Sequence, residues 1–146
     1  MKYLLHSSVI ADFLRGLPDV HARLTSTAPI DLGVTSVSVM ELRYSFILRP
    51  DLSVKTESVL TDLLSSVKVI DFGHRDAQDA ARILAEAQAR NQPLSVLSAQ
   101  ICSMARGRDL GLVIAHRTPE PHPFSLISGL RLIDWGTQAS PVPPAV

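Results

Sequence analysis

Four residues of this chain stand where an open parallel sheet would place its chemistry. His6 and His116 each follow a short apolar run that we expect to be a strand. Glu41 lies in the first turn of the helix expected after the second strand, and Ser98 opens a later helix. Ligands of open α/β sheets bind at the carboxyl ends of the strands. These side chains therefore predict a site with one carboxylate, two imidazoles and one hydroxyl.

The metals that such a site could take follow from its donor atoms. Mg²⁺ prefers several carboxylate oxygens, so Glu41 alone makes a poor magnesium site. If His6 and His116 both point at Glu41, the two imidazoles and the carboxylate fit Zn²⁺, Mn²⁺ or Fe²⁺ better. Structural interpretations compete: Glu41 could complete a capping box with Ser38, and Ser98 could be an ordinary first-turn residue. The chain has no Gly-rich phosphate loop, paired CxxC or HExxH motif.

Three arginines and one thiol are further candidates for chemistry. Arg43, Arg106 and Arg108 could each hold a phosphate through the guanidinium fork, although solvated helix charges are the commoner role. Cys102 lies on the apolar side of its predicted helix, so we expect a buried structural thiol. The remaining histidines are expected at the surface: His21, His74 and His122.

The composition is that of one folded domain without strong charge. The chain has 146 residues, of which 46% are hydrophobic and 19% charged. Because 14 Lys and Arg residues balance 14 Asp and Glu residues, no global charge draws it to nucleic acid or membrane. One cysteine excludes an intramolecular disulfide, and no apolar stretch has the length of a signal peptide or a membrane span. We therefore expect a cytoplasmic protein without membrane contact.

Predicted strands and helices alternate along the chain. Apolar and β-branched runs predict strands at residues 3–5, 33–37, 67–70, 111–114 and 130–133. Helical periodicity and end signals predict helices at 9–14, around 20–24, from 38 to before 50, at 54–66, around 77–87, and from 95 to 107. This alternation predicts an α/β fold with three α/β/α layers and a mainly parallel central sheet.

The prolines mark two unusual segments. Six of the ten prolines lie after Thr118, in the insert Pro119–Pro123 and in the final residues. We expect one domain over residues 1–136 and a disordered, Pro-rich tail over 137–146. The insert lies beside the expected crevice and is a candidate lid or occluding loop.

Four sequence blocks follow one another along the chain: Leu4–Ile10, Ser38–Tyr44, Leu97–Ile101 and Gly129–Trp135. Their order and spacing resemble those of PIN-domain proteins, specifically the VapC-type toxins, from Lys2 to Trp135. The resemblance implies a compact α/β/α domain that cuts RNA with Mg²⁺ or Mn²⁺. It also implies a homodimer restrained by a small VapB-like antitoxin.

The resemblance assigns the acidic site of these nucleases to four positions. They carry an Asp after the first strand, a Glu after the second, an Asp opening a later helix and an Asp or Asn after the next strand. Here the positions are His6, Glu41, Ser98 and His116, with Arg117 as the alternative to His116 after a one-residue slip. Only Glu41 is an acid. Losing roughly 4 kcal/mol of metal-dependent stabilisation costs on the order of a thousandfold in rate, so weak or absent ribonuclease activity is expected.

Three functional hypotheses follow. The chain could be a weakly active or inactive endoribonuclease toxin. It could instead be a non-catalytic module that binds RNA or an antitoxin-like helix, in a groove between the helix with Leu60 and Leu64 and the helix with Phe46. Thirdly, the substitutions could silence a toxic enzyme, in which case restoring Asp at His6 and Ser98 returns RNA cleavage.

Overall fold

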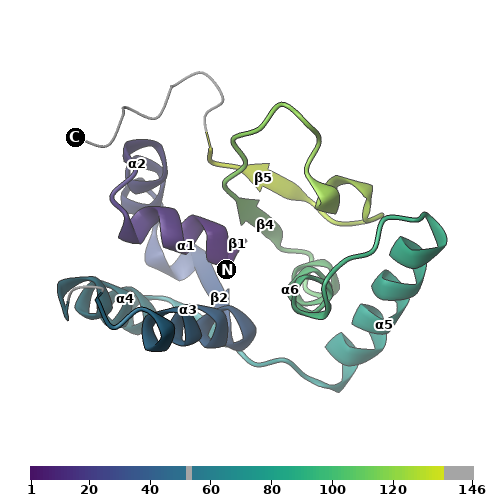
Figure 1. Cartoon of the computed structure of the whole chain (residues 1–146), viewed down its shortest axis with the longest axis horizontal. Helices are drawn as coiled ribbons and strands as arrows, with labels where there is room; N and C mark the ends of the chain where they lie inside the picture. The colour runs from purple at the N-terminus through teal and green to yellow at the C-terminus, as the bar shows by residue number, and fades with distance from the viewer. Residues whose placement is uncertain (52–53, 137–146) are drawn as a thin grey trace.

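The short apolar runs of the chain form one parallel sheet in a computed structural model that describes residues 1–51 and 54–136 (Figure 1). Within those residues the sheet has five strands in the order β3-β2-β1-β4-β5, and every neighbouring pair is parallel. The strands are Tyr3–Leu5 (β1), Leu32–Thr35 (β2), Lys68–Ile70 (β3), Gly111–Ile114 (β4) and Leu132–Asp134 (β5). The predicted α/β class is confirmed.

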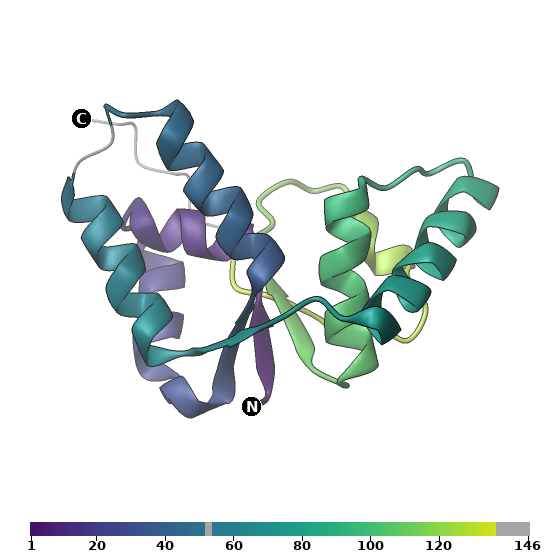
Figure 2. The same ribbon diagram turned by 90° about the horizontal axis from the view of Figure 1, so that it is seen from below.

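Helices cover both faces of this sheet. They are Ser7–Leu14 (α1), Pro18–Ser26 (α2), Ser36–Leu48 (α3), Val54–Ser66 (α4), His74–Ala89 (α5) and Val96–Gly107 (α6), with the 3₁₀ turns Pro29–Asp31 (η1) and Pro123–Leu126 (η2). Helices α1 to α4 gather on one side of the strands, and α5 and α6 lie on the other (Figures 1 and 2). The predicted three-layer arrangement is therefore confirmed.

The core has two halves because successive strand residues face opposite sides of a sheet. One half contains Leu4, Leu112 and Ile114 and packs under α5 and α6. The other half contains Leu5, Val34 and Val113 and packs under α1, α2 and α4. Strands buried on both faces have continuous apolar sequences, which made β1 and β4 recognisable without the structure.

Three predicted boundaries are wrong by a few residues. The second strand ends at Thr35, whose hydroxyl accepts the N–H of Ser38 at 2.9 Å and starts α3 at Ser36. The first helix begins at Ser7 because His6 caps it. The last strand is β5, Leu132–Asp134, and begins two residues later than the predicted 130–133.

The predicted Pro-rich tail, residues 137–146, lies outside the described residues. In the part of the chain that is described, no helix combines the length and the apolar character needed to cross a bilayer.

Candidate functional site

The strand order changes direction beside β1, since β2 and β3 lie on one side of it and β4 and β5 on the other. At such a point the carboxyl ends of adjacent strands open a crevice. β1 ends at Leu5 and β4 ends at Ile114, so His6 and the residues after Ile114 flank this edge. Helices α3 and α6 both begin at the same edge (Figure 2). The fold thus directs the elements that carry the predicted residues to one end of the sheet.

His6 is the N-cap of α1 rather than a free imidazole. Its Nδ1 accepts the N–H of Ser8 at 3.1 Å and lies 2.9 Å from the Ser8 hydroxyl oxygen. Because Nδ1 is an acceptor, we assign the proton of the neutral ring to Nε2. Burial of the ring, and secondly the nearby His122, lower the pKa of His6 to about 4. His6 is therefore a neutral imidazole with a structural role at neutral pH.

Glu41 lies in α3 and does not cap that helix. Thr35 provides the cap, so the capping box predicted from Ser38 and Glu41 is wrong. Burial raises the pKa of Glu41, while a hydrogen bond from the Ser7 side chain opposes the shift. Its Oε1 atom is buried and, within the described residues, has no hydrogen-bond partner. Glu41 is thus an incompletely satisfied carboxylate beside the first residue of α1.

Ser98 is bound into the first turn of α6. Its N–H donates to the Ser95 hydroxyl oxygen at 3.1 Å, and the two hydroxyl oxygens lie 2.9 Å apart. Thr35 and Ser38 make the same pair of contacts at the start of α3. The structural interpretation of Ser98 as a first-turn residue is confirmed.

The two candidates for the fourth position are both occupied by structural contacts. The backbone N–H of His116 donates to Asp134 at 3.0 Å, and its Nε2 contacts the carbonyl oxygen of Glu120. Arg117 instead bridges Asp12, at 3.1 Å, and Asp19, so it ties the segment after β4 to α1 and α2. Neither residue adds a carboxylate to the crevice.

These residues do not fit a divalent metal. Across residues 1–51 and 54–136, no three His, Cys, Asp or Glu side chains form a group able to hold a metal ion. The alternative zinc-type site of His6, His116 and Glu41 is therefore not assembled. A magnesium site is no better supported, because Glu41 is the one acid at the four positions and Mg²⁺ needs oxygen ligands with compensating charge.

The candidate phosphate-binding arginines are engaged with acidic side chains. Arg106 makes two hydrogen bonds to Asp79, at 2.6 and 3.1 Å, and one to the carbonyl of Ser128. Arg108 pairs with Asp76 at 2.7 Å. These pairs join α6 to α5.

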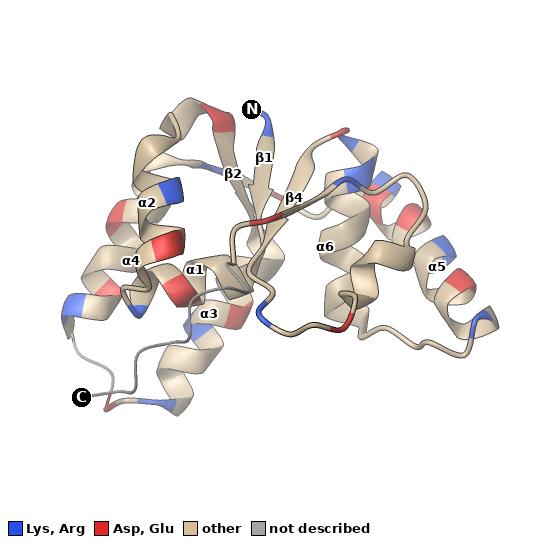
Figure 3. Cartoon of the chain, turned by 90° about the horizontal axis from the view of Figure 1, so that it is seen from above, with Lys and Arg blue, Asp and Glu red and all other residues tan. Residues whose placement is uncertain are grey.

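Arg43 contacts Glu57 at 3.4 Å between α3 and α4. Figure 3 shows blue and red residues interspersed over the helices. Cys102 is buried, and burial raises its pKa to about 12, as the prediction of a structural thiol required.

A row of aromatic rings was not predicted from the sequence. The ring of Phe124, which is 4% exposed, lies edge-on to His6 with centroids 5.5 Å apart. His122 lies 4.4 Å from Phe124 and 5.0 Å from His116. The surface position predicted for His122 is therefore wrong, because it is half-buried in this row. The contact of the Ser7 side chain with Glu41 was also missed.

Comparisons with known proteins support the fold through structure alone. No protein-family model matches the chain, and no curated protein matches it. Solved structures do match it. The DNA-bound VapBC structure from Salmonella typhimurium has a TM-score of 0.74 at 22% identity, covering 92% of this chain and 98% of that one.

Two further structures agree. The DNA-bound VapBC2 structure from Rickettsia felis has a TM-score of 0.76 at 20% identity, covering 92% of this chain and 99% of that one. FitAcB from Neisseria gonorrhoeae has a TM-score of 0.73 at 22% identity, covering 91% and 97%. The five-stranded parallel order and these matches together show that the chain has the same α/β fold as these VapBC and FitAcB structures.

Proposed function

We propose that the chain is a VapC-like toxin-family protein whose metal centre has lost most of its ligands, so that it cleaves RNA weakly or not at all. The observation that carries the proposal is the state of Glu41. It is the one acid at the four positions, it is partly buried, and one of its oxygens has no partner among the described residues. Two other family positions have structural contacts instead: His6 caps α1, and Ser98 is bound into the first turn of α6.

The physical reason is electrostatic. A bound divalent ion in a nuclease would supply an activated water and would stabilise charge on the phosphoryl oxygens. Several carboxylates are needed to offset the charge and the lost hydration of such an ion. In this chain, Glu41 is the one acid at the four family positions, so these positions provide a single negative charge at most.

The experiment is a calorimetric titration with Mn²⁺ together with cleavage of a labelled single-stranded RNA. We expect no saturable binding at millimolar Mn²⁺ and no multiple turnover. The matched variant is the double change His6→Asp and Ser98→Asp. Asp is a good N-cap, and a carboxylate suits a first helical turn, so both helices should keep their starts.

This double variant should bind Mn²⁺ and gain RNA cleavage, and adding Glu41→Gln should remove both gains. Tight Mn²⁺ binding with multiple turnover by the unaltered chain would contradict the proposal. If the double variant folds and binds Mn²⁺ without cleaving RNA, silencing by substitution at these two positions is excluded as an explanation.

We infer that the chain also binds an antitoxin-like partner. Support comes from the matched structures, which are described as VapBC and toxin–antitoxin complexes. It also comes from α3, whose outer face exposes large apolar side chains at helical spacing: Met40, Tyr44, Ile47 and Leu48. Leu60, which the predicted groove included, is fully buried in the core and is not available to a partner.

Co-expression with a small antitoxin-like protein, where one is encoded beside this chain, tests the partner. The pair should co-purify at a fixed ratio, and Ile47→Asp should abolish the complex because it puts a charge on the exposed face of α3. Ile30→Asp is the matched control, since Ile30 is equally exposed but lies on η1. Equal binding by both variants would exclude the α3 surface. A homodimer is implied by the same resemblance, and sedimentation of the chain alone tests it.

A further inference from the structure

The segment between β4 and β5, residues 115–131, makes an unusual crossover. β4 and β5 are parallel neighbours, so the chain must return to the other end of the sheet between them. Such crossovers are usually built around an α-helix. Here the connection contains only the 3₁₀ turn η2, and after β4 it passes over the carboxyl ends of the strands (Figures 2 and 3). We call residues 115–131 the cover segment.

The cover segment closes on the end of β1 through aromatic rings. Phe124 is 4% exposed and meets the ring of His6 at 5.5 Å with an interplanar angle of 74°. His122 packs edge-on against Phe124 at 4.4 Å. His122 also fixes its own ring, because its Nδ1 accepts the N–H of Phe124 at 3.1 Å. His6 orients its ring in the same way through Ser8, so both partners of Phe124 are preorganised.

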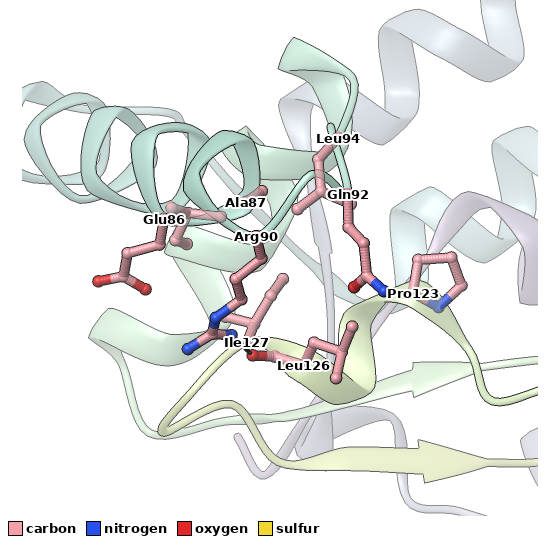
Figure 4. A pocket seen from close by; sticks show the side chains of 9 residues that line it. Glu86, Ala87, Arg90, Gln92, Leu94, Pro123, Leu126 and Ile127 are labelled. Atoms are coloured by element: carbon pink, nitrogen blue, oxygen red, sulfur yellow. Dashed lines mark hydrogen bonds between the residues drawn. The ribbon is translucent and has the colours of Figure 1, made fainter.

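Polar contacts hold the cover segment on its other side. Figure 4 shows Arg90, at the end of α5, reaching the carbonyl oxygen of Leu126, and the hydrogen bond joins these two groups. Arg106 of α6 donates to the carbonyl of Ser128 at 2.9 Å. Ile127 is buried in the core half under α5 and α6. The segment is therefore attached to α5 and α6 independently of its contact with His6.

We propose that the cover segment is an autoinhibitory strap, which Phe124 latches onto His6 and which must swing away before a ligand can enter the crevice beside β1. Two attachments are fixed: the contacts of residues 126–128 with α5 and α6, and the ion pairs that hold Arg117 to Asp12 of α1 and Asp19 of α2. The releasable part is the stretch between them, residues 118–125, in which Phe124 and His122 make ring contacts with His6 and His116. This stretch opens at lower cost than a strand of the sheet. This inference concerns access to the crevice and does not depend on the proposed function.

Hydrogen exchange tests the latch in the full chain. Phe124→Ala should speed the exchange of amides 122–125 by roughly tenfold or more, with the amides of β1 and β4 unchanged. The exposed ring of His6 should then titrate near its ordinary pKa instead of about 4, which two-dimensional NMR of the imidazole measures. Leu126→Ala is the matched control, because Leu126 is exposed in the same segment and makes none of the ring contacts described.

Phe124→Leu covers the case in which the alanine variant does not fold. It keeps most of the buried volume but removes the edge-on ring contact, and it should give the same pattern at smaller amplitude. If either folded variant leaves both exchange and the His6 titration unchanged, the latch does not exist. If exchange rises equally across β1, β4 and the cover segment, Phe124 is an ordinary core residue and the proposal is also overturned.

Discussion

At the scale of single residues, Glu41 is a partly buried acid whose removal should stabilise the fold. Its raised pKa means that the folded chain favours the neutral carboxyl, so its contribution to stability is full below the ordinary value of 4.5 and is lost as pH rises from there through the raised pKa of the folded chain. Glu41→Gln should therefore stabilise the fold at pH 7, on the order of 1 kcal/mol, because the change removes the charge from a partly buried group. Urea unfolding at pH 7 and pH 4 measures this, and the gain should shrink at pH 4. A loss of stability at pH 7 would show that Glu41 has a favourable partner.

Arg117 should behave in the opposite way, because removing its charge should destabilise the fold. It joins Asp12 and Asp19 on two helices, and the hydrogen bonds that it donates to Asp19, then to Asp12, raise its pKa despite partial burial. Arg117→Gln should cost about 1 to 3 kcal/mol, because it leaves Asp12, 8% exposed, with fewer partners. Arg49→Gln is the control, since its pair with Asp51 is solvent-exposed and should contribute little. Equal unfolding midpoints for the two variants would contradict this assignment.

At the scale of elements, the start of α1 and the cover segment should both weaken in acid. His6 has a folded pKa of about 4 against an ordinary 6.5, so its neutral form contributes stability above pH 6.5 that is lost as pH falls toward 4. The groups that influence this row are His122, His116 and Asp134, of which Asp134 alone favours protonation of His122. The loss should reach up to about 3 kcal/mol.

Unfolding at pH 7, 5.5 and 4.5 tests this dependence. His6→Asn should flatten it, because Asn can still cap α1 but does not titrate. His21→Gln should leave it intact, since His21 is exposed on α2. A parallel dependence in His6→Asn would assign the acid sensitivity to other groups.

Many helices and strands could be predicted from the sequence, and the wrong boundaries have physical causes. Helix α4 and strand β4 matched their predicted ranges because amphipathic spacing and a doubly buried run are local signals. The cap of α3 was misplaced because Ser38 and Glu41 have the spacing of a capping box, whereas Thr35 caps the helix without one. The choice between them depends on the pairing of Thr35 with Ile70, which belongs to the sheet and not to the local sequence.

The site was predictable in position but not in detail. Strand ends placed His6 and His116 at the correct edge, since parallel topology fixes where strands end. The ring row could not be predicted, because Phe124 and His6 are far apart in sequence and meet through a crossover without a helix. The acidic partners of Arg106 and Arg108 likewise lie on α5, about one helix and loop away.

At the scale of the whole molecule, the balance of charge limits how the chain can bind RNA. Equal numbers of acidic and basic residues, mixed over the helices, give no extended field to attract a polyanion (Figure 3). The logarithm of any RNA affinity should therefore fall with the logarithm of salt concentration with a slope of magnitude about 2 or less. Filter binding of a single-stranded RNA between about 50 and 200 mM salt measures this slope. A steep slope would reveal a concentrated basic surface.

The burial of Cys102 in α6 makes the chain convenient to label. The one native thiol has its pKa raised to about 12, so it stays protonated and shielded from alkylating reagents at neutral pH. A cysteine introduced anywhere on the surface would be the single reactive sulfur. Two introduced cysteines could thus carry a pair of fluorophores or spin probes, and the distance between the probes could be measured. Cys102 need not be removed first, so no cavity is left in the packed interior.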